Sequence, residues 1–221
     1  MELKAKGSIV LTKQPSQNRR IIVAVSGTGR SLANLIEKSA SFNFEITGVI
    51  ASNPSCRGVE VAKSAGIPLF IGNYSSDNLS NSQKEQWEFV RQLQPQLVVL
   101  AGFLKKFPLN QETTFDSPQI INIHPSLLPK FGGNGFYGEK VHKAVIDANE
   151  AYSGATVHFV DQEYDTGTLI SFAKLVINPM ETPESLSLRV FELEKNLLPT
   201  TISMLLDHQL PLHDKSWELV L

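Results

Sequence analysis

The chain has 221 residues, of which 42% are hydrophobic and 19% are charged, and its formal net charge at pH 7 is −2. This composition excludes a disordered chain, and the length allows one large domain or two close halves. The weak net charge offers no general attraction to nucleic acid or to anionic membranes, so we expect partners of neither class. The single cysteine, Cys56, excludes an internal disulfide, which fits a reducing compartment such as the cytoplasm. No apolar run approaches the roughly 20 residues that a membrane span needs.

Residues 1–19 are polar and basic, and their apolar run at 9–11 is too short for the core of a signal peptide. We interpret them as a flexible leader, with an extra edge strand or a transit peptide as alternatives. Residues 20–221 are predicted to form a single domain with an N-terminal half of about 20–115 and a C-terminal half of about 116–221.

Strand and helix patterns alternate through the N-terminal half. The apolar run 21–25, the glycine loop 26–29 and a helical spacing of apolar residues predict the opening of a parallel α/β sheet. A helix is expected to start at Ser82, where Glu85 would complete a capping box. The other predicted elements are a helix at 59–65 and strands at 44–50, 69–71, 97–101 and 120–123.

In the C-terminal half, the sequence predicts a helix at about 138–149 and a strand at 155–160. Two short strands, 168–172 and 174–177, are expected to be an antiparallel addition because their connections are too short for crossover helices. A long helix is predicted to begin at Thr182 and Pro183 and to bend or end at Pro199. The predicted fold is therefore α/β, a Rossmann-like and mostly parallel sheet flanked by helices.

The pair Asn122 and His124 is the most informative feature of the sequence. The two residues lie at positions i and i+2 at the end of an apolar run, so on a strand their side chains share one face. Pro125 is expected to end that strand. An amide beside an imidazole at a strand end suits a reaction centre, and a structural histidine is an equally good interpretation of the pair alone.

The glycine loop after the first strand lacks the third small residue of a dinucleotide-binding fingerprint. The helix after it still presents free amides and a positive dipole end, which suits a phosphate monoester better than a pyrophosphate. Arg30 and Ser31 would add donors. The alternative is a glycine turn that serves only packing.

The exit of the predicted strand 97–101 is a further candidate, because ligands of open α/β sheets bind at the carboxyl ends of strands. Leu104 and Phe107 can line an apolar slot, and Lys105 and Lys106 can meet carboxylates at its rim. The alternative is a hydrophobic strand exit with two solvated lysines.

Three acids, Asp161, Glu163 and Asp165, gather just before Gly167, and a solvated acidic loop is the simplest interpretation. These acids match no twelve-residue calcium loop, and the histidines show no zinc-binding spacing, so we expect no metal site. A serine-hydrolase elbow is also missing from the sequence.

Together these motifs resemble the phosphoribosylglycinamide formyltransferases, the folate-dependent transformylases of purine synthesis, over roughly residues 20–205. The His-Pro-Ser-Leu-Leu-Pro element is specific to folate formyltransferases as a group, and the phosphate loop and the acidic loop narrow the resemblance further. The segments that carry it are 26–29, 100–103, 122–129, 157–160 and 165–167.

The resemblance implies a cytoplasmic enzyme, monomeric or homodimeric, with small-molecule substrates. It would transfer the formyl group of 10-formyltetrahydrofolate to the amine of glycinamide ribonucleotide without a metal. Asn122 and protonated His124 would donate hydrogen bonds to the developing oxyanion. Asp165 would raise the pKa of His124 and help to move a proton from the amine to the folate nitrogen.

The resemblance also implies binding residues in both halves. The ribonucleotide is expected on Gly29, Arg30, Ser31, Leu32 and Glu194. The folate donor is expected on Leu100, Leu104, Lys105, Lys106, Phe107, Asn122, Asp161, Gln162, Glu163, Tyr164 and Asp165. The glycine-rich segment 132–138 is interpreted as a loop over the substrate, or as a plain connector. The sequence departs from the usual family pattern at Thr28, Arg30, Lys105, Lys106, Gln162 and Phe191.

Three other functions fit parts of the pattern. A formyltransferase acting on an amino-sugar nucleotide would keep Asn122, His124 and Asp165 but would not need the phosphate loop. A formyltetrahydrofolate hydrolase would release formate without an amine acceptor. A folate- or nucleotide-binding protein would lack turnover altogether. Formylation of transfer RNA is disfavoured, because it calls for a more basic surface.

Overall fold

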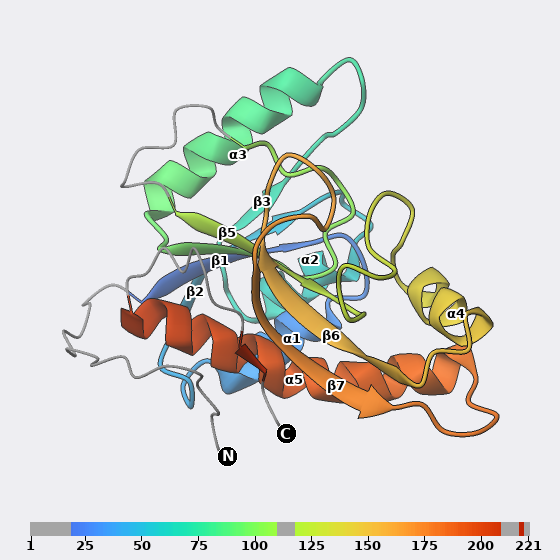
Figure 1. Ribbon diagram of the computed structural model, residues 1–221. Helices are drawn as coiled ribbons and strands as arrows, with labels where there is room; N and C mark the ends of the chain where they lie inside the picture. Colours follow the sequence, from blue (N-terminus) through green and yellow to red (C-terminus); the bar gives the residue numbers. More distant parts are fainter. Residues whose placement is uncertain (1–18, 110–117, 209–216, 219–221) are drawn as a thin grey trace. The chain divides into compact units, whose positions relative to one another are not determined.

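The computed structural model describes residues 19–109, 118–208 and 217–218 (Figure 1). Of the expected leader, residues 1–18 lie outside the described part of the chain. The fold divides into two compact units, one of residues 17–121 and one that contains residues 122–221. None of the described helices has both the length and the hydrophobicity to span a bilayer.

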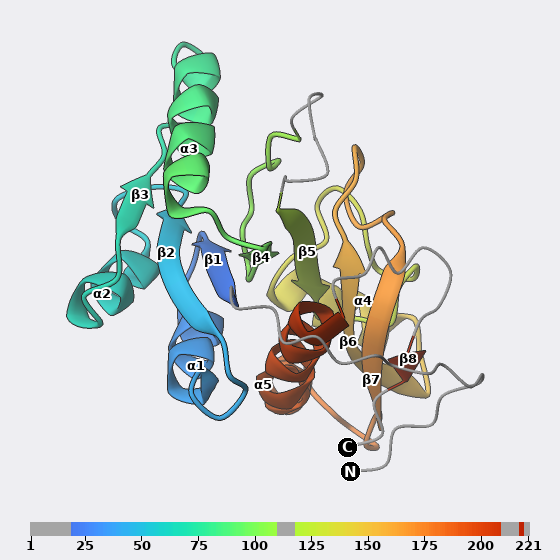
Figure 2. The ribbon, with the colours of Figure 1, turned by 90° about the vertical axis from the view of Figure 1, so that its left-hand side faces the viewer.

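The first unit is a parallel sheet with the strand order β3-β2-β1-β4, and Figure 2 shows β3, β2 and β1 side by side. Its strands are nearly continuous apolar runs, as expected where helices cover both faces of a sheet. The chain passes from β1 outward to β3 and then returns to place β4 on the other side of β1. Its elements are β1 (Arg20–Val25), α1 (Arg30–Lys38), β2 (Glu45–Ala51), α2 (Arg57–Ser64), β3 (Leu69–Ile71), α3 (Leu79–Leu93) and β4 (Leu97–Leu100).

This reversal of strand order between β1 and β4 creates a topological switch point, where open α/β sheets bind ligands. The loops that leave the two strands are joined there by backbone and side-chain hydrogen bonds. The Ser26 amide donates to the Gly102 carbonyl at 3.0 Å, and the Leu104 amide donates to the Ser26 hydroxyl at 2.8 Å. The glycine loop and the exit of β4 therefore form one continuous surface within the first unit.

The second unit is built on an antiparallel strand pair and a long helix. The strand β5 (Gln119–His124) begins in the first unit and ends in the second. β6 pairs antiparallel with β7, and β8 lies parallel to β7. A buried hydrogen bond of 2.6 Å between the hydroxyls of Ser171 and Thr201 ties β7 to α5. The remaining elements are α4 (Glu139–Asp147), β6 (Tyr152–Phe159), β7 (Leu169–Val176), α5 (Pro183–His208) and β8 (Trp217–Glu218).

The predicted class, a mostly parallel α/β sheet with an antiparallel C-terminal addition, is confirmed. The two short strands expected at 168–172 and 174–177 are instead the single strand β7. The helix expected from Ser82 begins at Leu79, and the Ser82 hydroxyl accepts a hydrogen bond from the Asn73 amide rather than capping the helix.

Pro199 does not end α5, which continues to His208. A proline inside a helix removes one hydrogen bond and costs roughly 3 kcal/mol. Leu197, Leu198 and Ile202 around it are all buried, and the burial of a leucine or isoleucine side chain contributes about 2 kcal/mol each. Burial of this helix face therefore outweighs the local preference of proline.

The start of α5 offers a test of local stability. Thr182 and Ser185 form a reciprocal cap, because the Ser185 amide donates to the Thr182 hydroxyl and the Thr182 amide donates to the Ser185 hydroxyl. Thr182→Ala should lower the free energy of unfolding by about 1 kcal/mol in urea denaturation. Thr182→Ser keeps the hydroxyl and should match the wild type. Equal losses in both variants would assign the effect to the threonine methyl group instead.

Candidate active site

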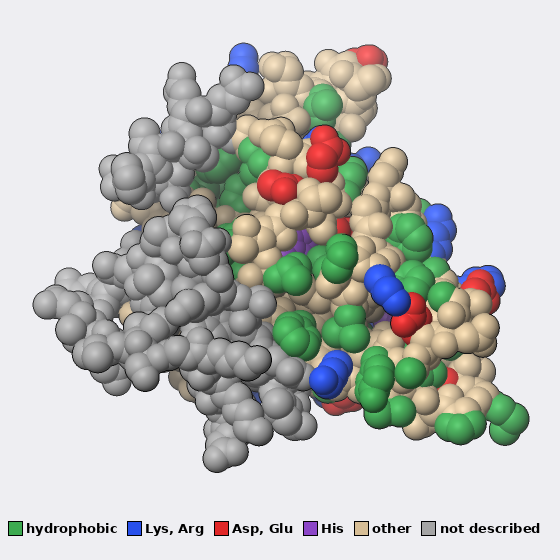
Figure 3. Space-filling view, in the orientation of Figure 1, with side chains coloured by type: hydrophobic (Ala, Val, Ile, Leu, Met, Phe, Trp, Pro, Cys, Tyr) green, Lys and Arg blue, Asp and Glu red, His purple; other side chains and the backbone are tan. Residues whose placement is uncertain are grey.

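The second unit brings together the three residues that the sequence singled out as catalytic. The side-chain amide of Asn122 donates to Asp165 Oδ1 at 3.2 Å, and His124 Nδ1 lies 3.4 Å from Asp165 Oδ2. Only 5% of the His124 side chain and 9% of the Asp165 side chain are exposed. On the face drawn in Figure 3, histidine appears only as small areas between other side chains. The cluster is therefore a buried, polar arrangement at the end of β5.

Asp165 is held in place by the acidic loop around it. Its backbone has a φ of +59°, in the left-handed region that is uncommon outside glycine. The Asp161 carboxylate accepts hydrogen bonds from the Glu163 amide and the Thr166 hydroxyl, which close the loop. A Cβ at Gly167 would lie 1.8 Å from the Phe159 carbonyl oxygen, so only glycine fits there. The loop thus has a structural task, which is to place one carboxylate.

The glycine-rich segment contacts two of the three candidates. His124 Nε2 lies 2.7 Å from the Phe131 carbonyl oxygen, and the Gly133 amide donates to Asp165 Oδ2 at 2.9 Å. A carbonyl oxygen only accepts, so Nε2 of His124 carries a hydrogen. In the neutral ring, Nδ1 then carries a lone pair that faces Asp165 Oδ2. Protonation of the ring would place a hydrogen between Nδ1 and Oδ2.

Burial lowers the pKa of His124 below its ordinary value. Asp165 and the Phe131 carbonyl act in the opposite direction. Asp165 therefore raises the pKa of His124, as expected, but its influence is smaller than that of burial. Desolvation of the imidazolium outweighs the attraction of the carboxylate, so the neutral ring is favoured in the free protein.

Asp165 shows the reverse balance. Burial would raise the pKa of its carboxyl group, but the polar surroundings of the carboxylate, which include the hydrogen bond from the Gly133 amide, hold that pKa below its ordinary value. The carboxylate is therefore ionised at neutral pH, although little of it meets solvent.

One residue of this cluster, His158, was not assigned to the site from the sequence. His158 lies at the end of β6, only 2% exposed, and its Nε2 atom is 3.0 Å from the Asn122 amide nitrogen and 3.4 Å from Asp165 Oδ1. Its Nδ1 atom is 2.8 Å from the Phe159 carbonyl oxygen. A histidine between Val157 and Phe159, seven residues before Asp165, was the available signal.

In the first unit, the glycine loop has the geometry of an anion cradle at the start of α1. Gly29 has a φ of +74°, and a Cβ there would lie 2.9 Å from the Gly58 Cα, so the turn requires glycine. The first helical hydrogen bond runs from the Ala33 amide to the Gly29 carbonyl, so the amides of residues 30–32 precede it. Arg30 is exposed, and Ser31 is half-buried. The side chain of Leu32 is fully buried, so only its amide is suited to a ligand.

The predicted folate-binding residues at the exit of β4 differ in their exposure to solvent. Leu104 is 49% exposed, and Lys105 and Lys106 are exposed beside it. Leu100 and Phe107 are buried. The Phe107 ring packs edge-on against the Trp87 ring, with 6.0 Å between the ring centroids. Phe107 therefore supports the exit from behind rather than lining an open slot.

The remaining binding candidates lie in the second unit. Glu194 is half-buried on α5, and the exposed residues of the acidic loop are Asp161, Gln162, Glu163 and Tyr164. Within the described residues, no group of three or more histidine, cysteine, aspartate or glutamate side chains is arranged to hold a metal ion.

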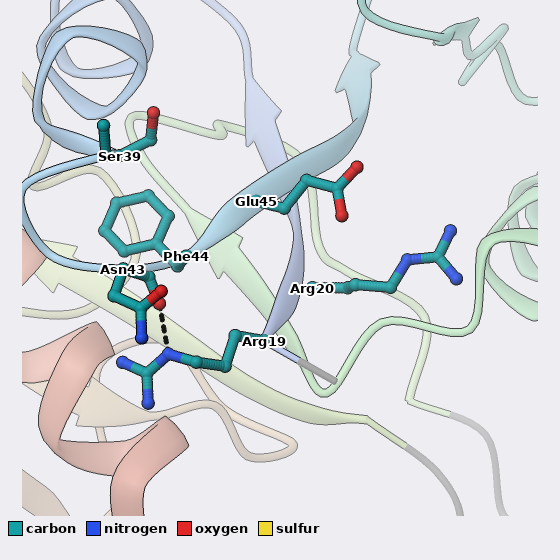
Figure 4. A pocket seen from close by; sticks show the side chains of 7 residues that line it. Arg19, Arg20, Ser39, Asn43, Phe44 and Glu45 are labelled. Carbon is teal, nitrogen blue, oxygen red and sulfur yellow. Dashed lines mark hydrogen bonds between the residues drawn. The ribbon is translucent and has the colours of Figure 1, made fainter. Parts of the chain in front are cut away.

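A cavity of about 320 Å³ in the first unit involves none of the predicted site residues (Figure 4). It lies at the amino ends of β1 and β2, where the Arg19 guanidinium donates to the Asn43 and Phe42 carbonyls. Its lining residues are Arg19, Arg20, Ser39, Ala40, Asn43, Phe44 and Glu45. Because the glycine loop follows the carboxyl end of β1, this cavity and the candidate phosphate site occupy opposite ends of the strand.

Comparison with known proteins identifies the family. The family model described as formyl transferase matches residues 19–202. This chain belongs to the formyl transferase family. It is 36% identical over 200 residues to the chloroplastic phosphoribosylglycinamide formyltransferase of Arabidopsis thaliana, covering 88% of this chain and 68% of that protein. It is 32% identical to the phosphoribosylglycinamide formyltransferase of Haemophilus influenzae, covering 89% of this chain and 91% of that protein.

A solved structure extends the comparison to the fold. The phosphoribosylglycinamide formyltransferase of Coxiella burnetii superimposes with a TM-score of 0.75 at 32% identity, covering 85% of this chain and 86% of that one. The Rossmann-like architecture is therefore the family's own.

Burial and Asp165 shift the pKa of His124 in opposite directions, so the effect of removing the Asp165 charge on that pKa can be predicted. Asp165→Asn removes a carboxylate that favours the imidazolium, while the burial that lowers the pKa stays in place. The pKa of His124, followed by NMR of the ring resonances in the free protein, should therefore fall further in the variant. An unchanged or raised pKa would show that Asp165 does not act on His124 electrostatically.

Proposed function

We propose that this chain transfers the formyl group of 10-formyltetrahydrofolate to the amine of 5′-phosphoribosylglycinamide, a step of purine synthesis. The observation that carries the proposal is the buried cluster of Asn122, His124 and Asp165 at the end of β5. The names of the Arabidopsis and Haemophilus relatives support the choice of acceptor. We propose the cytoplasm as its compartment, although the Arabidopsis relative is chloroplastic by name.

In the proposed reaction the substrate amine attacks the formyl carbon, and negative charge develops on the formyl oxygen. The Nε2–H group of His124, which meets the Phe131 carbonyl oxygen at 2.7 Å, is suited to donate to such an oxygen instead. The Asn122 amide would supply a second donor. Loss of one donor of this kind typically raises the barrier by about 3 kcal/mol.

Proton movement completes the proposed step. As the tetrahedral intermediate collapses, the bond between the formyl carbon and the folate nitrogen breaks, and the amine proton passes to that nitrogen. The developing oxyanion would raise the pKa of His124, since a nearby negative charge favours the imidazolium. Asp165, ionised and 3.4 Å from Nδ1, would stabilise the same form.

The binding roles follow the resemblance and the exposure of each residue. Arg30, Ser31 and the Leu32 amide at the start of α1 are proposed to hold the phosphate of the ribonucleotide. Glu194 is proposed for the ribose hydroxyls. Leu104, Lys105, Lys106 and the acidic loop are proposed to contact the folate, with Leu100 and Phe107 as support. The oligomeric state, monomer or homodimer, stays a prediction.

The decisive experiment measures tetrahydrofolate release from 10-formyltetrahydrofolate with and without glycinamide ribonucleotide. We expect release only with the ribonucleotide, and no detectable turnover in His124→Ala, whose folate affinity should stay within a few-fold of the wild type. Release without the ribonucleotide would establish a hydrolase. Release only with an amino-sugar nucleotide would show that the acceptor is an amino sugar rather than glycinamide ribonucleotide. No release with any acceptor would indicate a binding protein.

The phosphate assignment has its own test. Arg30→Ala should raise the KM for the ribonucleotide by about tenfold, since a hydrogen bond to a charged group contributes roughly 1.5–3 kcal/mol. The KM for the folate should change little. Lys63→Ala, which removes an exposed cation from α2, is the matched control and should leave both KM values unchanged. Equal increases for both substrates in Arg30→Ala would count against a phosphate contact.

A further inference from the structure

His158 occupies an irregular point of β6. The pairing of β6 with β7 shifts register between Val157 and His158, so that Val157 lies opposite Ser171 and His158 opposite Leu169. Such irregularities re-aim a side chain and occur often beside active sites. Here the imidazole is directed to Asn122 and Asp165 and is 2% exposed.

The hydrogen-bond partners of His158 define its tautomer. Nδ1 lies 2.8 Å from the Phe159 carbonyl oxygen, which can only accept, so Nδ1 carries a hydrogen. A neutral imidazole carries one ring hydrogen, and Nε2 is then an acceptor. Nε2 faces two groups, the amide nitrogen of Asn122 at 3.0 Å and Asp165 Oδ1 at 3.4 Å. The nearer of the two, the amide nitrogen, is a donor and matches an acceptor at Nε2.

This arrangement also defines the orientation of the Asn122 amide. Its nitrogen donates to His158 Nε2 at 3.0 Å and to Asp165 Oδ1 at 3.2 Å. A flipped amide would set its oxygen against a lone pair of His158 and against a carboxylate oxygen. Both contacts would then be repulsive, in a place where neither can be relieved by solvent.

We propose that His158 is a positioning residue for formyl transfer, which keeps the amide nitrogen of Asn122 directed to the reacting oxygen by accepting one of its two hydrogens. The second hydrogen, shared with Asp165 at the longer distance, is the one passed to the formyl oxygen. The inference rests on the proposed function, because it concerns the donor role of Asn122.

Two substitutions separate the two ring nitrogens of His158. His158→Gln places a carbonyl oxygen near the Nε2 position and keeps the acceptor for Asn122. His158→Asn places an amide nitrogen near the Nδ1 position, keeps the donor to Phe159 and removes the acceptor. We expect kcat to fall by about 100-fold in His158→Asn, as for loss of an oxyanion donor, and by less than about tenfold in His158→Gln. The KM values should change little in either variant.

A double variant distinguishes positioning from a general structural role. In an Asn122→Ala background there is no amide to orient, so His158→Asn should cause no further loss of kcat. An undiminished further loss would overturn the proposal, as would equal losses in the Gln and Asn variants or wild-type turnover in His158→Asn.

A measurement on the free protein keeps the inference independent of activity. NMR of the ¹⁵N-labelled imidazole rings should show a hydrogen on Nδ1 of His158 and none on Nε2, whether or not the wild type forms product. A hydrogen on Nε2, in a neutral or a charged ring, would overturn the proposal. Failure of the wild type to transfer formyl to the ribonucleotide would instead reject the proposed function.

Discussion

The site depends on the ionised Asp165 carboxylate, which the fold keeps almost entirely out of water. A buried charge is costly unless hydrogen bonds and opposite charges compensate for it. The Gly133 and Asn122 amides supply those hydrogen bonds, and the His124 and His158 rings complete its surroundings. The glycine-rich segment, β5 and β6 therefore each contact the same carboxylate. A shift of any of these segments would expose the carboxylate to water or remove one of its hydrogen-bond partners.

The backbone around the carboxylate is shaped to the same end. Asp165 and Phe131 both have positive φ angles, of +59° and +57°, although neither is glycine. Conformations of this kind cost about 1–3 kcal/mol each and persist only where neighbouring contacts require them. The hydrogen bonds that Asp161 accepts within the acidic loop provide such contacts for Asp165. The hydrogen bond from His124 provides one for Phe131. Local strain and site geometry are thus parts of one arrangement.

Local sequence patterns predicted those parts of the molecule that local rules control. Continuous apolar runs located the parallel strands within one or two residues, and the i, i+2 spacing placed Asn122 and His124 correctly on one strand. The start of α3 was not predictable, because tertiary packing decides it. The role of His158 and the lowered pKa of His124 depend on burial depth and on partners distant in sequence, which a pattern does not contain.

The lowered pKa of His124 is consistent with catalysis rather than opposed to it. An enzyme gains rate only from interactions that are stronger in the transition state than in the ground state. A permanent ion pair between His124 and Asp165 would place its stabilisation in the resting enzyme. Burial disfavours that pair in the free protein, while the pKa of the Asp165 carboxyl group beside Nδ1 stays below its ordinary value. In the proposed reaction the imidazolium becomes favourable as negative charge develops on the substrate, so that the electrostatic gain would fall on the reaction step itself.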